Sequence, residues 1–214
     1  VISDSSGNVY SVGSKTNWQF QTVKFNSAGT IQWKRQLGSS VSIGRGIALD
    51  SSNNLYITGM SDQVSGAAYN IVTAKYNTSG AIQWQRSLGS SGIDEGHGIA
   101  VDGSGNSYVV GSSNTSGNYN IIIAKYDTSG TLQWQRSVVN NVEVESYLSG
   151  ITVDGAGDLI LSGSVGQFFG NQNGMVMKYP ADGSVIGTFG DWTFAVSSLT
   201  TGTPTHTIGN ASLT

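Results

Sequence analysis

The sequence predicts an all-β fold, a β-propeller of four-stranded antiparallel blades with about 50 residues per blade and four blades visible. A ten-residue segment recurs almost unchanged from Lys24, Lys75 and Lys125, and a decayed copy begins at Lys178. A period of about 50 residues is typical of propeller blades and solenoid units. Helical and leucine-rich solenoids are excluded because no segment keeps the 3.6-residue apolar spacing of a helix.

Each repeat contains four short segments with strand character, separated by turn residues. In the third repeat these segments are residues 98–102, 107–111, 119–126 and 131–138. Gly, Asn and Asp between the first two segments favour a tight turn, and Asp127-Thr128-Ser129-Gly130 is a hairpin turn. The last segment alternates apolar and polar residues, as a half-buried strand does. Four antiparallel strands per repeat are the content of a propeller blade.

The repeats divide the chain into a propeller region and a tail. We expect a propeller over residues 1–199, with blades at about 1–46, 47–98, 99–150 and 151–199. Residues 200–214 are rich in Thr, Ser and Gly and suggest a linker or the start of a fibrous region. Because the sequence starts in mid-repeat, we expect part of a longer polypeptide or a multi-chain assembly that completes the ring.

Three tryptophans and three aspartates mark equivalent positions of the repeats. We expect Trp33, Trp84 and Trp134 to wedge between adjacent blades, where burial of each ring stabilises the fold by about 2–4 kcal/mol. In the fourth repeat Gly187 replaces the tryptophan, and Phe189 and Trp192 are expected to fill the space.

The aspartates that end the first strand are expected to cap the turns that follow them. They are Asp50, Asp102 and Asp154. A calcium loop is the alternative, but each turn offers only one carboxylate, and Ca²⁺ usually takes several. The glycines that end the second strand are expected to let the backbone leave the sheet. They are Gly13, Gly59, Gly111 and Gly163.

Composition excludes several classes of function. Charged residues are only 11% of the chain and the net charge is −3, which argues against a nucleic-acid partner. Cysteine is absent, so the chain has no disulfide and no thiolate metal site. No apolar run approaches 18 residues, so we expect no membrane insertion. Low charge with many small polar residues is typical of extracellular and virion β-proteins, and we expect that localisation.

No residues stand out as catalytic, metal-binding or cofactor-binding. Asp94, Glu95 and His97 could form a metal or acid–base cluster, but a solvated loop joining two blades is the simpler interpretation. His206, the second histidine, lies in the Thr-rich tail. The sequence shows no Ser-His-Asp set, no paired carboxylates and no phosphate-binding glycine loop.

Variable loops that follow the second strand of each repeat emerge on one face, and loops on a rigid scaffold commonly carry binding. The loops are Lys15–Phe20, Ser61–Tyr69, Ser112–Tyr119 and Ser164–Gly174. Their aromatic residues are the candidate binding-loop contacts: Trp18, Tyr69, Tyr119, Phe168 and Phe169. For Tyr69 and Tyr119 the alternative is that they simply open the third strand.

The repeat pattern resembles a known family. Asp-x-x-Gly-Asn-x-Tyr-x-x-Gly, then Ala-Lys-Tyr-x-x-Ser-Gly-x-x-x-Trp, then Gly-Ile-Ala-Val-Asp is similar to the bacterial β-propeller repeat, or SBBP, family of secreted and surface proteins. The resemblance covers about residues 1–190. It implies a scaffold of six to eight blades rather than a reaction. The tail resembles, in composition only, low-complexity segments of marine phage structural proteins.

These observations favour a non-enzymatic structural or adhesion module of a virion, such as a phage tail or appendage, or of a cell-surface assembly. Its loops would contact other structural subunits or surface glycans. A secreted carbohydrate-binding lectin is the alternative, which one binding pocket per blade would distinguish. A polysaccharide-degrading enzyme is the third hypothesis. It would need convergent acidic or histidine residues at the mouth of the central channel, whereas these repeats are nearly identical and differ mainly in their loops.

Overall fold

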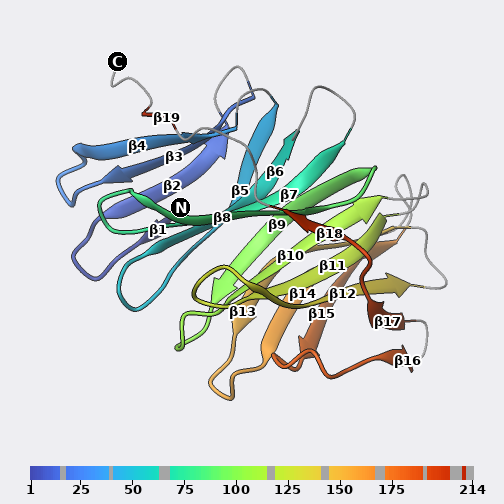
Figure 1. Cartoon of the computed structure of the whole chain (residues 1–214). Coiled ribbons are helices and arrows are strands. Elements are labelled where there is room, and N and C mark those ends of the chain that lie inside the picture. The colour runs from blue at the N-terminus through green and yellow to red at the C-terminus, as the bar shows by residue number, and fades with distance from the viewer. Residues whose placement is uncertain are drawn as a thin grey trace.

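The computed structural model describes residues 1–14, 18–38, 41–62, 68–114, 119–140, 145–166, 172–189, 192–202 and 209–210. Every regular element in these ranges is a β-strand, so the predicted all-β fold is confirmed (Figure 1). Within the same ranges, no helix has the length and apolar character needed to cross a membrane.

The strands form four repeat units, here called blades 1 to 4. Blade 1 contains β1 (Ile2–Ser3), β2 (Val9–Ser14), β3 (Phe20–Phe25) and β4 (Ile31–Leu37). Blade 2 contains β5 (Ser42–Leu49), β6 (Leu55–Asp62), β7 (Tyr69–Tyr76) and β8 (Ile82–Gly89). Blade 3 contains β9 (Ile93–Val101), β10 (Ser107–Asn114), β11 (Tyr119–Tyr126) and β12 (Leu132–Asn140). Blade 4 contains β13 (Glu145–Val153), β14 (Leu159–Gly166) and β15 (Gln172–Tyr179).

Within each blade, consecutive strands pair antiparallel, and the blades spread as a fan (Figure 1). The first strands β5, β9 and β13 lie side by side along the inner edge of the fan. One rim carries the tight turns, here called the turn rim. The opposite rim, here called the loop rim, carries the ends of the second strands and the connections between blades. The strand ends from which the predicted variable loops leave therefore lie at the loop rim.

Each of the three repeat tryptophans packs between two blades, as predicted. Trp84 of β8 lies against Tyr56 of its own blade and Tyr126 of the next, with ring centroids 5.9 and 6.1 Å apart. Its indole nitrogen donates to the Thr128 carbonyl of the next blade, 3.1 Å away. Trp33 and Trp134 repeat this arrangement with the same type of partners.

An arginine two residues after each tryptophan strengthens the same interface. Arg86 donates from Nε to the Gly130 carbonyl at 2.7 Å and from a terminal nitrogen to the Ser129 carbonyl at 3.2 Å. Charge-assisted bonds of this kind are about twice as strong as neutral ones. We call the tryptophan and arginine together a staple. The staples are Trp33 with Arg35, Trp84 with Arg86, and Trp134 with Arg136.

The aspartates close the turns that follow the first strands. Asp102 accepts hydrogen bonds from the backbone nitrogens of Ser104 and Asn106, and from the Asn106 amide and the Tyr108 hydroxyl. These bonds hold the pKa of Asp102 below its ordinary value, although burial opposes the shift. Asp50 makes the same set of bonds. Asp154 caps its turn and also pairs with Lys178 at 2.7 Å.

The first strands begin earlier than the predicted blade boundaries. β9 starts at Ile93, so His97 lies inside a strand and not in a joining loop as expected. His97 is the extra residue of a β-bulge: its neighbours Gly96 and Gly98 pair with Gly111 and Val110, which are consecutive in β10. The sequence pattern did not indicate a strand here because this segment consists mainly of polar residues and glycines, whereas strands are usually recognised by apolar or β-branched residues.

The glycines of the second strands do not end those strands, contrary to expectation. Gly59 lies within β6, opposite the bulge of β5. A Cβ at Gly59 would overlap the Ile43 carbonyl oxygen, and one at Gly111 would overlap the Glu95 carbonyl oxygen. These glycines therefore allow the close approach of the bulged first strand.

The chain after blade 4 turns back over the fan. It forms β16 (Gly187–Phe189), β17 (Trp192–Val196), β18 (Thr200–Gly202) and β19 (Gly209–Asn210). β17 pairs with the outer strand β12, β18 with β8, and β19 with β4, all antiparallel. These three strands, here called the strap, cover the outer edges of blades 3, 2 and 1 in reverse order (Figure 1). The predicted linker region thus includes two strands.

The fourth repeat does not complete its own blade. β16 pairs with β17, and among the described residues β15 pairs only with β14. The expectation that Phe189 and Trp192 help to fill the space of the missing tryptophan is met in part: the Phe189 ring meets that of Phe194 edge-on at 6.1 Å, and Trp192 is partly buried against the cluster that contains Phe194 and Tyr179. Phe189 is exposed, and Trp192 pairs with Asn140 of β12. Phe194 is the residue that stacks on Tyr179, with ring centroids 5.5 Å apart.

Candidate functional site: the loop rim and the inner edge

Trp18 is the exposed aromatic residue of the loop rim in blade 1. Its side chain is 59% exposed, and its backbone φ of 55° lies in the left-handed region that side chains rarely adopt. The Trp18 carbonyl accepts hydrogen bonds from the backbone nitrogen and hydroxyl of Ser42, at the start of blade 2. The fold therefore fixes the backbone of Trp18 while its indole faces solvent.

The other candidate contacts lie at equivalent places on successive blades. Tyr69 and Tyr119 are half-buried and open β7 and β11, which is the simpler of the two predicted roles. Tyr119 also contacts the ring of Tyr147 in blade 4, at a centroid distance of 5.6 Å. Phe168 and Phe169 lie outside the described residues. The three described candidates are thus distributed along the rim of blades 1 to 3 and not gathered in one cluster.

A row of polar side chains runs along the inner edge, from the bulge of one first strand to the next. Arg45 of β5 donates to Nδ1 of His97 of β9 at 3.3 Å and pairs with Glu95 at 3.1 Å. His97 Nε2 lies 3.0 Å from the Ser112 hydroxyl, and its ring meets that of Tyr147 edge-on at 6.5 Å. The row therefore connects blades 2, 3 and 4.

This geometry assigns the protonation state of His97. Because an arginine can only donate, Nδ1 of His97 is the acceptor and the proton of the neutral ring resides on Nε2, which donates to Ser112. Burial, and secondarily the positive charge of Arg45, lower the pKa of His97 to about 4. His97 is therefore neutral at pH 7 and both of its nitrogens are engaged.

The structure separates the three residues considered as a metal or acid–base cluster. Glu95 and His97 belong to the inner-edge row, whereas Asp94 is buried and accepts hydrogen bonds from the backbone nitrogen and hydroxyl of Ser90. The part of the chain that the structure describes contains no group of three or more His, Cys, Asp or Glu side chains able to hold a metal ion.

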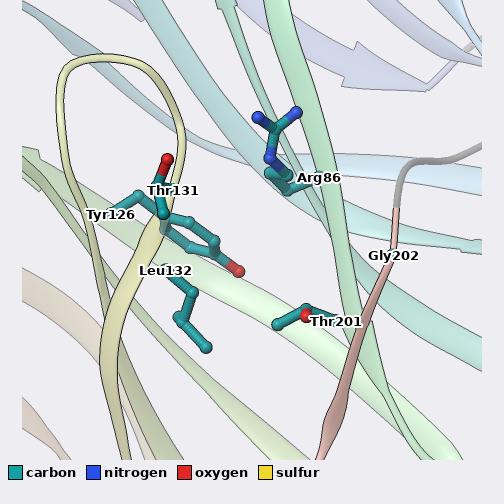
Figure 2. Close-up of a pocket in the computed structure, with 6 residues that line it drawn as sticks. All are labelled: Arg86, Tyr126, Thr131, Leu132, Thr201 and Gly202. Carbon is teal, nitrogen blue, oxygen red and sulfur yellow. The ribbon is translucent and has the colours of Figure 1, made fainter.

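A pocket of about 370 Å³ lies on the outer side, where the strap crosses blade 2 (Figure 2). Its lining comes from β8, from the hairpin of blade 3 and from β18: Arg86, Tyr126, Thr131, Leu132, Thr201 and Gly202. Figure 2 shows Tyr126 and Leu132 facing Thr201 across the pocket. The hydroxyl of Tyr126 is buried without a hydrogen-bond partner among the described residues, and burial raises its pKa.

The register of the strap explains why this pocket exists. Phe194 stands opposite Val138 of blade 3, and Thr201 stands opposite Leu88 at the equivalent position of blade 2. The Phe194 ring fills the space beside Tyr179. The small Thr201 leaves the corresponding space beside Tyr126 open.

Sequence reasoning missed the inner-edge row and the pocket. A signal for the row was present, since Gly-x-Gly flanks both Arg45 and His97 and two glycines around one residue favour a bulge. The pocket left no signal, because it depends on the register of the strap and not on the composition of the repeat.

Residues 32–63 and 83–120 match the family model of the SBBP beta-propeller repeat. Each matched segment runs from the outer strand of one blade into the next blade, so it includes a complete staple and the first two strands of the blade that follows. No curated protein matches the chain. The antiparallel blades and the two matches agree: the chain contains repeats similar to the SBBP beta-propeller repeat.

Proposed function

We propose that the chain is a non-enzymatic structural or adhesion module of a virion, such as a phage tail or appendage, or of a cell-surface assembly. Its loop rim contacts another structural subunit or a surface glycan. A beta-propeller repeat fits a protein-interaction module, since blades form a rigid scaffold for loops of differing sequence. The exposed Trp18 carries the proposal.

Trp18 has the properties of a binding residue. A large exposed aromatic ring gains more from burial in an interface than from remaining in water, and tryptophan is enriched among residues that dominate binding. A tryptophan at positive φ costs stability, and such strain persists where the surrounding structure enforces it. Here the hydrogen bonds to Ser42 enforce it.

The inner-edge row supports a structural role over catalysis. The neutral His97 has both nitrogens engaged by Arg45 and Ser112, and its low pKa differs from that of a general base working near pH 7. The low fraction of charged residues supports an extracellular or virion location.

The test compares Trp18→Ala with Phe189→Ala, because Phe189 is also a largely exposed aromatic residue but lies in β16 of the fourth repeat. Cross-linking mass spectrometry on the native assembly should place a second polypeptide at the loop rim. Trp18→Ala should abolish that contact and Phe189→Ala should preserve it.

A glycan array run with the same three proteins separates the alternatives. Glycan binding that Trp18→Ala removes, without a protein contact at the rim, would favour the lectin. If Trp18→Ala leaves both protein and glycan binding unchanged, the proposed role of the loop rim is wrong.

A further inference from the structure

The pocket where the strap crosses blade 2 has a polar group at its floor that the fold does not use (Figure 2). Tyr126 is only 1% exposed, and its hydroxyl has no hydrogen-bond partner among the described residues. Figure 2 shows this hydroxyl directed into the space between Arg86 and Thr201. A buried hydroxyl costs free energy unless it is hydrogen-bonded, so an acceptor that enters the pocket would gain from meeting it.

The equivalent tyrosine of blade 4 shows what the Tyr126 hydroxyl lacks. Tyr179 donates to the Val185 carbonyl at 2.8 Å, and the Phe194 ring stacks on it at a centroid distance of 5.5 Å. Beside Tyr126 the strap instead presents two small residues, Thr201 and Gly202. The chain therefore completes the surroundings of the tyrosine in blade 4 but leaves a pocket at the one in blade 3.

Arg86 places a positive charge at one end of this pocket. Its Nε and its two terminal nitrogens donate to the carbonyls of Gly130, Gln85 and Ser129. A guanidinium has five N–H groups, so two remain after these three bonds. Arg86 forms no ion pair with any residue that the structure describes. The pKa of Asp127 is lowered chiefly by the Ser129 hydroxyl and only slightly by Arg86, and the Asp127 oxygens are engaged within the hairpin.

These donors favour a ligand with a negatively charged acceptor. Arg86 can only donate, and burial raises the pKa of Tyr126, so its hydroxyl keeps its proton at neutral pH. A carboxylate has only acceptor oxygens, and its planar shape matches that of a guanidinium. One arginine balances one negative charge, which favours a carboxylate over a phosphate group that carries nearly two.

The rest of the lining suits a hydroxylated ring. Thr131 and Thr201 are exposed at the rim of the pocket and offer hydroxyls, whereas Leu132 and the ring of Tyr126 form an apolar side. Hexoses carry hydroxyls around the ring edge and C–H groups on the ring faces, so they need both kinds of lining. The pocket volume of about 370 Å³ lies near the lower end of the range of about 300–1,000 Å³ that small-molecule pockets span. One sugar unit is therefore a suitable size.

We propose that this pocket binds a hexuronic acid. The carboxylate of the sugar accepts from the remaining N–H groups of Arg86 and from the Tyr126 hydroxyl. The ring lies over Leu132, with its hydroxyls towards Thr131 and Thr201. The site lies on the outer side of the fan and not on the loop rim, so it stands independently of the proposed function.

The first experiment tests the charge, by NMR titration of the full chain with D-galacturonate, D-galactose and inorganic phosphate. Galacturonate and galactose differ only at C6, which is a carboxylate in one and a hydroxymethyl group in the other. Galacturonate should bind at least about tenfold more tightly than either of the other two probes. Tighter binding of a galacturonate oligosaccharide than of the monosaccharide would identify a polymer as the source of the acid, and weaker binding a free acid.

Three variants test the place. Tyr126→Phe should weaken galacturonate binding about tenfold without lowering the unfolding midpoint, because the hydroxyl that it removes has no partner in the free protein. Tyr76→Phe is the matched control, since the Tyr76 hydroxyl is also buried without a partner among the described residues but does not line this pocket. It should leave binding unchanged. Thr201→Phe should abolish binding, because its ring would occupy the pocket.

Several results would overturn the inference. The pocket is not a uronate site if neither galacturonate nor glucuronate binds at about 10 mM, or if galactose or phosphate binds as tightly as galacturonate. Unchanged binding by Tyr126→Phe or Thr201→Phe, or an equal loss in Tyr76→Phe, would place the acid elsewhere. Trp18→Ala should bind galacturonate as the parent does, so a failure of the loop-rim proposal would not affect this result.

Discussion

In blade 3 the outer strand β12 pairs with β11 and places Trp134 against the hairpin of blade 4. In blade 4 the corresponding residues leave β15, fold back as β16 and β17, and pair with β12. Both units have a similar first hairpin and third strand. The difference is that blade 4 has Gly187 in place of the tryptophan and no following hairpin to receive a staple among the described residues. The position of an outer strand therefore depends on its staple as well as on its neighbouring strand.

The largest effect should come from removing a staple. Trp84→Ala should lower the free energy of unfolding by about 3–5 kcal/mol, because it empties a buried site between two blades. Trp18→Ala should change it by less than about 0.5 kcal/mol, since that ring is exposed. Denaturant unfolding of both variants makes the measurement. A loss under about 1 kcal/mol for Trp84→Ala would mean that the staple is not what holds adjacent blades together.

The second-largest loss of stability should come from Phe194, which packs against Tyr179 where blade 4 lacks a tryptophan. Phe194→Ala should cost about 2–4 kcal/mol, because Phe194 is buried and stacks on Tyr179. Hydrogen exchange at β17 shows whether this loss is local. Faster exchange confined to the strap would mean that the strap opens separately from the blades, and unchanged exchange would contradict the role of Phe194 in holding β17 against Tyr179.

The stability of blade 3 should be more sensitive to acid than that of blade 4. The bulge of β9 in blade 3 carries His97, which can bind a proton, whereas the bulge of β13 in blade 4 carries Ser149. The folded state holds the pKa of His97 at about 4, so the unfolded chain binds the proton more readily. The contribution of His97 to the free energy of unfolding is therefore fully present above about pH 6.5. It falls towards pH 4, by at most about 1.4 kcal/mol per pH unit.

His97→Gln checks this assignment, because glutamine can accept from Arg45 and donate to Ser112 without titrating. Unfolding measured from pH 7 to pH 4 should lose this part of its slope in the variant. The aspartate turns lose stability at lower pH, since their pKa values are depressed from 3.8. An unchanged slope would mean that other groups account for the sensitivity near pH 5.

The smallest effect should be a gain in the free energy of unfolding. Thr201→Phe places a ring opposite Leu88, as Phe194 stands opposite Val138, and should fill the pocket beside Tyr126. Cavity filling of this kind commonly adds about 0.5–2 kcal/mol. Thr201→Val, which adds no ring, is the control for β-propensity. A lower unfolding midpoint for Thr201→Phe would show that the pocket is too small or too polar for a ring.

The repeat made much of the fold predictable. Trp33, Trp84 and Trp134 wedge between blades as expected, since large aromatic rings at a fixed period have few other places to be buried. The strap was not predictable from its residues. Thr200, Thr201 and Gly202 have no apolar pattern, and they are held by backbone hydrogen bonds that any sequence can make.

The candidate site was predictable in part. The loop rim follows from where the second strands end, and Trp18 is exposed there. The inner-edge row depends on bulges that bring Arg45, Glu95 and His97 together from two blades. Pattern reading treats such residues as loop, because charged side chains are unusual within a strand.

The path of the strap has a consequence for how the protein folds. The blades consist of contacts between residues close in sequence, which form early, whereas Gly209 pairs with Gln36 near the other end of the chain. The strap can therefore dock only after blades 3, 2 and 1 exist, and it then covers the outer edges that bare strands would offer to other molecules. During synthesis those edges stay uncovered until the strap has emerged. A chain that ends after blade 4 should keep its blades but aggregate through β4, β8 and β12.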